Sequence, residues 1–128
     1  MRYGFLTAAA LALSACASTG PSSNTYSYAA TDTAFTGWVR FSNGGFQLYG
    51  DEDQVLQPFS RPCVSGAASR DEMRQAVQDL GGQKVRITGR TVPWRTASNG
   101  RIEHEGSDIR NDCGGPFVIL ADDIRPAN

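Results

Sequence analysis

The chain has 128 residues, with 12 basic and 13 acidic side chains and a formal net charge of −1. A charge this close to zero argues against electrostatic capture of nucleic acid, because such binding needs many contacts to phosphates. We therefore expect no nucleic-acid partner. The length favours one small domain, near the lower end of the sizes that build an adequate core alone.

The first residues have the features of an export signal. Arg2 supplies the positive charge of such a signal, and residues 5–13 form an apolar run that is too short to span a bilayer. An aliphatic residue, two small residues and a cysteine end this segment, and they are Leu13, Ser14, Ala15 and Cys16.

These four residues resemble the lipobox of bacterial lipoprotein precursors. The resemblance implies that residues 1–15 are removed and that Cys16 carries lipid on its thiol and an acyl group on its new amine. Two or three acyl chains anchor a protein stably, at ~0.8 kcal/mol per buried methylene. The alternative is an ordinary secretory signal that is cleaved nearby, in which Cys16 has no special role.

Ala17, and not an aspartate, follows Cys16, and the sorting rules of such lipoproteins then favour the outer membrane. We expect a lipid-anchored protein of the bacterial cell envelope that faces the periplasm. Residues 16–34 are rich in Ser, Thr, Ala and Gly without a hydrophobic period, which predicts a flexible tether. The folded domain is expected over residues 35–128.

The domain begins with a predicted hairpin. Residues 36–42 are rich in β-branched and aromatic side chains, and residues 46–49 continue with an alternating pattern. Asn43 and Gly44 between them accept positive φ angles cheaply, which favours a tight turn. A short third strand is expected over residues 61–65.

A helix follows, and it begins with a capping box in which Ser69 accepts from the Glu72 amide while Glu72 reaches back. An apolar stripe at helical spacing predicts the face that packs on the sheet. Its members are Met73, Ala76, Val77 and Leu80. Gly81 and Gly82 are expected to end the helix.

Two strands complete the domain. Residues 83–92 alternate between apolar and polar side chains, with Gly89 at a position that allows a sharp bend. Residues 93–115 are polar and predict a long loop with a short excursion at residues 101–105, and residues 117–124 predict a last, central strand.

Three strands, one helix and two strands is the element order of the oligonucleotide/oligosaccharide-binding (OB) fold. Residues 35–126 resemble small OB-like domains of exported bacterial proteins. The resemblance implies a mainly β fold, a five-stranded barrel with one capping helix.

With Cys16 used for lipid, Cys63 and Cys113 remain, and an even remainder in an oxidising compartment predicts one disulfide. A redox-active pair and a metal site are the alternatives. The chain has no CxxC spacing, however, and its single histidine, His104, does not complete a zinc shell.

Two polar clusters are candidates for sites of chemistry. The acidic residues 51–53 lack the glycine and the distal glutamate of a calcium loop, so a solvated turn is the better interpretation. Residues 103–105 place His104 between two glutamates that would face away from it in a strand. We predict no catalytic residues, no metal and no cofactor.

The aromatic residues offer binding surfaces as well as core. Four of them are expected to fill the barrel, namely Trp38, Phe41, Phe46 and Phe117. In OB-like barrels, strands two and three, framed by loops one-two and four-five, bind bases or sugars. Tyr49, Trp94 and Arg95 are therefore the candidate ligand-binding residues, with Arg40 and Arg90 as further contributors if exposed.

These features together predict a non-catalytic, lipid-anchored OB-like module that binds a glycan, peptidoglycan or an envelope protein through loop four-five. The alternative is a small lipoprotein inhibitor or assembly factor that acts on an envelope enzyme. A hydrolase with His104 as its base is a third hypothesis.

Overall fold

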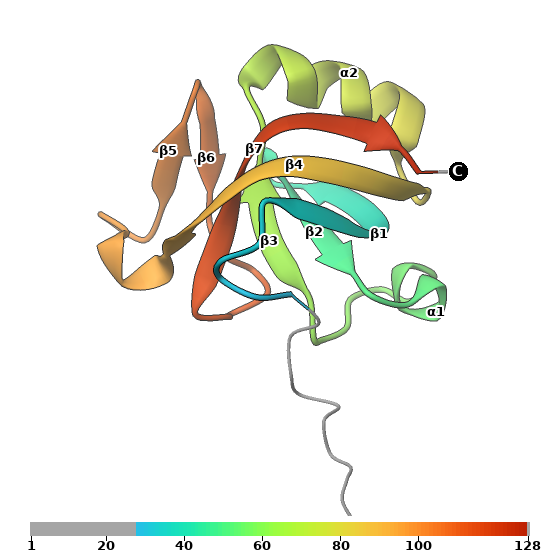
Figure 1. Ribbon diagram of the computed structural model, residues 1–128, viewed down its shortest axis with the longest axis horizontal. Helices are drawn as coiled ribbons and strands as arrows, with labels where there is room; N and C mark the ends of the chain where they lie inside the picture. The colour runs from blue at the N-terminus through green and yellow to red at the C-terminus, as the bar shows by residue number, and fades with distance from the viewer. Residues whose placement is uncertain (1–27, 128) are drawn as a thin grey trace, which may run out of the picture.

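The structure is a computed structural model that describes residues 28–127 (Figure 1). The residues that resemble a lipobox, 13–16, lie outside these residues. Five strands close into a barrel in the order β1-β2-β3-β7-β4, in which β3 and β7 are parallel and the other neighbours are antiparallel. The strands are β1 (Ala34–Ser42), β2 (Gly45–Tyr49), β3 (Val64–Ala67), β4 (Lys84–Pro93) and β7 (Phe117–Pro126). The predicted small OB-like barrel is thereby confirmed.

One main helix, α2 (Arg70–Leu80), lies across the barrel between β3 and β4 in the chain, as Figure 1 shows. The short helix α1 (Glu52–Val55) follows β2. The segment between β4 and β7 contains the 3-10 turn η2 (Trp94–Thr96) and a hairpin of β5 (Ile102–His104) and β6 (Ser107–Ile109). The expected polar loop is therefore partly folded, with a second small sheet inside it.

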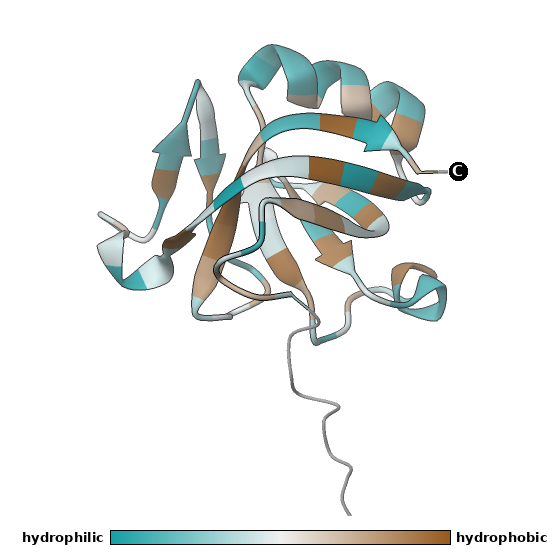
Figure 2. Cartoon of the chain, in the orientation of Figure 1, coloured by the Kyte–Doolittle hydropathy of each residue, from teal (hydrophilic) through white to brown (hydrophobic). Residues whose placement is uncertain are grey.

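The strands form where the sequence alternates. Along β1, Phe35 and Val39 are buried and face the interior, while Thr36 is exposed. Figure 2 shows the same alternation along the first half of β4. At the turn between β1 and β2, Asn43 and Gly44 have φ angles of 55° and 82°, as the tight hairpin turn requires.

The barrel interior and the buried face of α2 form one apolar cluster. Its largest fully buried side chains are Phe35, Phe46, Leu48, Ile87, Ile109 and Ile119. Phe46 and Phe117 are buried as expected, and Phe41 is only half-buried against the cluster. The expectation that Trp38 fills the barrel is wrong, because Trp38 alternates with Val39 and lies on the outer face of β1.

The helix α2 begins at the predicted cap, but the Glu72 side chain makes a different hydrogen bond from the one expected. The Ser69 hydroxyl oxygen accepts from the Glu72 amide at 3.2 Å. The Glu72 carboxylate does not complete the box, because it accepts from the backbone N–H of Ile124 at 3.1 Å. Three members of the predicted stripe are buried, whereas Val77 is 53 % exposed, so the stripe that faces the barrel is narrower than expected.

Gly89 lies where the strand pairing changes register. The pairing of β4 with β7 shifts between Thr88 and Gly89. A Cβ atom at position 89 would overlap the carbonyl oxygen of Leu120, so β7 runs closer to β4 here than a side chain allows. The bend expected at Gly89 therefore has a steric cause.

The end of the predicted tether packs on the barrel. The Tyr28 hydroxyl donates to the carbonyl of Thr36 at 2.7 Å, and its ring lies edge-on to Phe35 with centroids 5.9 Å apart. The amide of Gly89 donates to the carbonyl of Thr33 at 3.0 Å. Burial raises the pKa of Tyr28 to about 12. Residues 28–33 thus contact the barrel, and the extent of the tether before them stays a prediction.

Among residues 28–127, no helix has the length and apolar character needed to cross a membrane.

Candidate functional site

The outer face of β2 and β3 is where an OB-like barrel is expected to bind its ligand. Here the polar side chains of this face, Gln47 and Ser65, are each 3 % exposed. Gln47 alternates with Phe46 and Leu48, which point into the barrel, and it pairs with Ser65 across the strands, so the cover comes from outside the barrel. The segment before β7 provides that cover, and the amide of Cys113 donates to the Ser65 hydroxyl at 3.1 Å.

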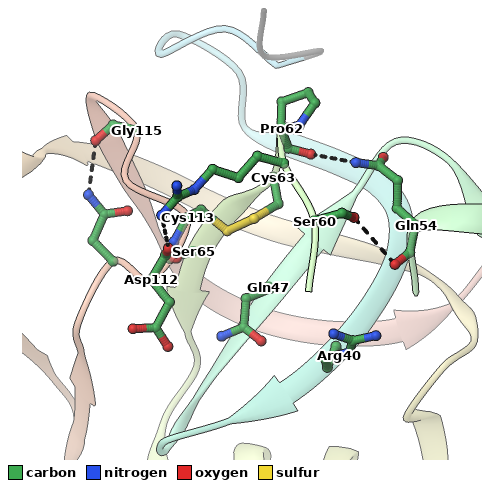
Figure 3. Close-up of a disulfide and its surroundings, with 12 residues drawn as sticks. Arg40, Gln47, Gln54, Ser60, Pro62, Cys63, Ser65, Asp112, Cys113 and Gly115 are labelled. Carbon is green, nitrogen blue, oxygen red and sulfur yellow. Dashed lines mark hydrogen bonds between the residues drawn. A yellow bond between two sulfur atoms is a disulfide. The ribbon is translucent and has the colours of Figure 1, made fainter. Parts of the chain in front are cut away.

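Cys63 and Cys113 form the disulfide that the sequence predicts, with sulfur atoms 2.00 Å apart and Cα atoms 5.4 Å apart. Figure 3 shows this bridge beside Ser65 on the covered face. It joins the start of β3 to the loop before β7. The sulfur atoms therefore hold that loop against the outside of the barrel.

Tyr49 belongs to this disulfide cluster and is fully buried, together with Cys63 and Cys113 and next to Val55. The expectation that Tyr49 is an exposed ligand-binding residue is wrong. Its hydroxyl has no hydrogen-bond partner among the described residues. Burial raises the pKa of Tyr49, and the nearby Arg40 guanidinium, 5.7 Å from the ring centroid, opposes that rise.

Three side-chain hydrogen bonds close the loops over the same face. Asn43 donates to the Asp112 carboxylate at 3.1 Å, and Arg61 donates to the Asp112 carbonyl at 3.0 Å. Asn111 donates to the Gly115 carbonyl at 2.9 Å. The space left between these loops and the sheet is about 10 Å³, enough for a single water. The protein therefore fills its own OB-type cleft.

Arg40 is fully engaged in holding the segment after α1. Its guanidinium donates to the carbonyl of Val55 at 2.6 Å and also to the carbonyls of Gln57 and Pro58. The α1 segment itself starts at Asp51, whose carboxylate accepts from the Asp53 amide at 3.1 Å. The acidic residues 51–53 thus begin a helix, where a solvated turn was expected.

Trp94 and Arg95 lie apart from the covered cluster. Trp94 is half-buried against the apolar core, and its backbone N–H donates to the Pro116 carbonyl at 2.9 Å. Arg95 is exposed on the turn η2. Since Tyr49 is buried, the three predicted binding residues do not form one exposed patch, and a role for Trp94 and Arg95 stays a prediction.

His104 is held by the backbone. Its Nε2 atom lies 3.0 Å from the carbonyl oxygen of Ala121 and 4.0 Å from the Glu105 carboxylate, with the side chain 11 % exposed. No group of three or more His, Cys, Asp or Glu residues in the range 28–127 is arranged to hold a metal ion.

A groove lies between α2 and the β1–β2 hairpin, and no sequence pattern predicts it. This groove has a volume of about 350 Å³ and an apolar floor of Phe41, Met73 and Val77. Arg70 and Arg74 stand at its helical side. Two sequence features are consistent with this groove: Phe41 lies near the end of β1, and Val77 lies at the edge of the helical stripe.

In comparisons with protein-family models, curated proteins and solved structures, nothing matches this chain at a significant level.

Proposed function

We propose that this protein is a lipid-anchored, non-catalytic module of the bacterial cell envelope that binds a partner protein in the groove beside α2. We call this groove, with its floor of Phe41, Met73 and Val77 and its rim of Arg70 and Arg74, the helix groove. The lipobox at Cys16 supports the anchor. The exposed Val77 and the half-buried Phe41 in the helix groove are the observation that carries the binding role.

The chemistry of the helix groove indicates what binds there. Val77 is 53 % exposed on a helix whose other apolar side chains are buried, so a partner that covers it removes apolar surface from water. Among the described residues, Arg74 forms an exposed ion pair with Asp71 at 3.4 Å, which contributes little stability. A segment with an apolar side chain and a carboxylate fits this floor and rim.

The usual ligand-binding face of an OB barrel is covered in this protein, which favours a binding site elsewhere on the surface. Gln47 and Ser65 stand where a bound chain would contact the sheet, but both are buried. Ser65 accepts from the amide of Cys113, and Gln47 accepts from the Ser42 hydroxyl. Opening that face would break the disulfide or move the loop. The helix groove is open without any such change.

The state of the reactive side chains supports a non-catalytic role. Cys63 and Cys113 are joined, so neither is a thiol nucleophile. His104 has its Nε2 atom 3.0 Å from the Ala121 carbonyl oxygen, which only accepts hydrogen bonds, so Nε2 carries a proton there and does not take one from a substrate. These contacts favour a binding module over the hydrolase hypothesis.

Lipidation is tested on the protein produced in a lipoprotein-processing bacterium. We expect radiolabelled palmitate in the protein and loss of the label in Cys16→Ser. Mass spectrometry should find the mature chain starting at an acylated Cys16. An unmodified thiol at this position would refute the anchor without bearing on the helix groove.

Partner binding is tested with the protein immobilised and exposed to detergent-solubilised envelopes of its host. Val77→Asp places a charge on the apolar floor and should release the partner, detected by quantitative mass spectrometry. Leu56→Asp is the matched control, because Leu56 is 77 % exposed and follows α1. A set of retained proteins that is the same in both variants would contradict the proposed groove.

A further inference from the structure

The outer face of β1, β4 and β7 carries a second arrangement of side chains that the groove does not use. Cross-strand pairing aligns Trp38 with Lys84, Thr36 with Arg86, Arg86 with Arg125, and Thr88 with Asp123. These side chains alternate with the buried Val85, Ile87 and Ile124, so they all stand on the outside of the barrel. We call this surface the basic face.

The basic face concentrates positive charge in a chain that is slightly acidic as a whole. Lys84, Arg86 and Arg125 are exposed there, with Asp123 as the one carboxylate among the paired side chains. The hydrogen bond from the Thr88 hydroxyl, at 2.8 Å, lowers the pKa of Asp123, and Arg125 and Arg86 act in the same direction. The face therefore has an excess of two positive charges against −1 for the full chain.

Trp38 gives the basic face an aromatic surface. The Lys84 ammonium lies over the indole ring, 5.1 Å from its centroid, in a cation–π contact, so the Lys84 side chain turns away to pair with an anionic group when a sugar ring packs on this indole face. A half-buried indole on an open sheet face offers a flat apolar plate. A ligand that binds Lys84 is therefore placed next to Trp38.

We propose that the basic face binds an anionic glycan. A sugar ring packs its C–H groups on the indole of Trp38, while Lys84 and Arg86 pair with carboxylate or phosphate groups of the chain. The Asp123 carboxylate accepts hydrogen bonds from sugar hydroxyls. This site is separate from the helix groove and does not depend on the lipid anchor.

A glycan, which presents hydroxyl groups between its charged groups, fits this face better than a nucleic acid does. Nucleic acid binding rests on many phosphate contacts, and two excess charges supply few of them. The Asp123 carboxylate repels a dense row of phosphates but is a normal acceptor for hydroxyl groups. Sugar hydroxyls also suit the exposed Thr36 on the same face.

The test is calorimetric titration of the protein with tetragalacturonate, an oligosaccharide with one carboxylate per ring. Neutral maltotetraose is the control ligand. We expect binding of the charged oligosaccharide that weakens with added salt, and weaker or no binding of the neutral one. No binding of tetragalacturonate at low salt would overturn the proposal.

Variants locate the binding site. Lys84→Gln combined with Arg86→Gln should weaken binding about tenfold, which corresponds to about 1.4 kcal/mol for the loss of two exposed charge pairs. Arg101→Gln removes one charge on the β5–β6 side, where Arg101 faces Asp108 at 3.9 Å, and should leave the affinity unchanged. An equal loss in Arg101→Gln would mean nonspecific charge attraction and would overturn the site.

Variants of Trp38 distinguish the binding of a glycan from the binding of other anions. Trp38→Ala should lower the affinity for tetragalacturonate, and Trp38→Tyr, which keeps an aromatic plate on the same backbone, should retain most of it. Vesicles of phosphatidylcholine and phosphatidylglycerol form the last arm. Vesicle binding that requires Lys84 and Arg86 but not Trp38, together with no oligosaccharide binding, would assign the face to a lipid surface and refute the glycan.

Discussion

The carboxylate of Glu72 accepts a hydrogen bond from the backbone N–H of Ile124 at 3.1 Å. Glu72 lies in the first turn of α2, and Ile124 lies in β7, more than 50 residues further along the chain. This bond links the start of the helix to the barrel. A capping box would have linked Glu72 only to Ser69 in the same helix. The helix groove lies along the same helix, so its geometry depends on this attachment.

Loss of this attachment should destabilise the fold. We predict that Glu72→Ala lowers the free energy of unfolding by about 2 kcal/mol, because a buried amide loses a charged acceptor. Asp71→Ala is the matched control, since the Asp71 carboxylate is 91 % exposed and pairs only with Arg74. Urea denaturation measures both, and similar losses in the two variants would show that the bond to Ile124 is unimportant.

The disulfide should dominate the stability of the covered face. The bridge closes a loop of 50 residues, and chain entropy gives it about 4 kcal/mol. We predict a loss near this size in the double variant Cys63→Ser with Cys113→Ser. Hydrogen exchange should also speed up at residues 110–115. Unchanged exchange there would mean that the hydrogen bonds of Asn111 and Asp112 hold the loop without the bridge.

Substitutions of Tyr49 test whether its buried hydroxyl contributes to the stability of the fold. No described residue accepts from or donates to it, so Tyr49→Phe removes an unsatisfied polar group without leaving a large cavity. We predict that the free energy of unfolding stays equal or rises, by up to about 1 kcal/mol. Tyr49→Ala, which empties the space beside the disulfide, should cost about 4 kcal/mol. Thermal and urea denaturation distinguish the two, and a large loss in Tyr49→Phe would reveal a hidden partner.

Alkaline pH should weaken the packing of the N-terminal segment. The pKa of Tyr28 is about 12 in the folded protein against an ordinary value of 10.0, so the unfolded chain releases this proton first. The contribution of Tyr28 to the free energy of unfolding is fully present below pH 10 and falls as the pH rises from 10 to about 12. Tyr28→Phe should be less stable at neutral pH, because it lacks the bond to Thr36, but should lose less between these two pH values. Melting temperatures across this range measure the difference.

The element order was predictable because local patterns dominate it. The turn at Asn43 and Gly44, the cap at Ser69 and the alternation from Val85 to Ile87 each reflect short-range sterics or periodicity. The hairpin of β5 and β6 was missed because its strands have three residues each and carry little pattern. Its partners are distant, and the Glu105 carbonyl accepts from the Arg70 amide at 3.1 Å.

The site was less predictable than the fold. Periodicity places Tyr49 on the outside of the barrel, which is correct, but it does not say that a loop from residue 113 lies over that position. Trp38 was expected in the core on composition alone, whereas its neighbours in β1 place it outside. Val77 belongs to the helical stripe by spacing, yet the barrel is too narrow to cover it.

The sequence by itself determined which segments become strands and helix, and which two cysteines remain to pair, because these depend on neighbouring residues and on a count. Only the tertiary structure decided which outward-facing side chains meet solvent. The disulfide loop buries Tyr49, while nothing described covers Val77, and strand pairing gathers Lys84, Arg86 and Arg125 from two strands. Burial and charge density at a surface depend on segments that are far apart in the chain. A local sequence pattern does not show which of these segments come together.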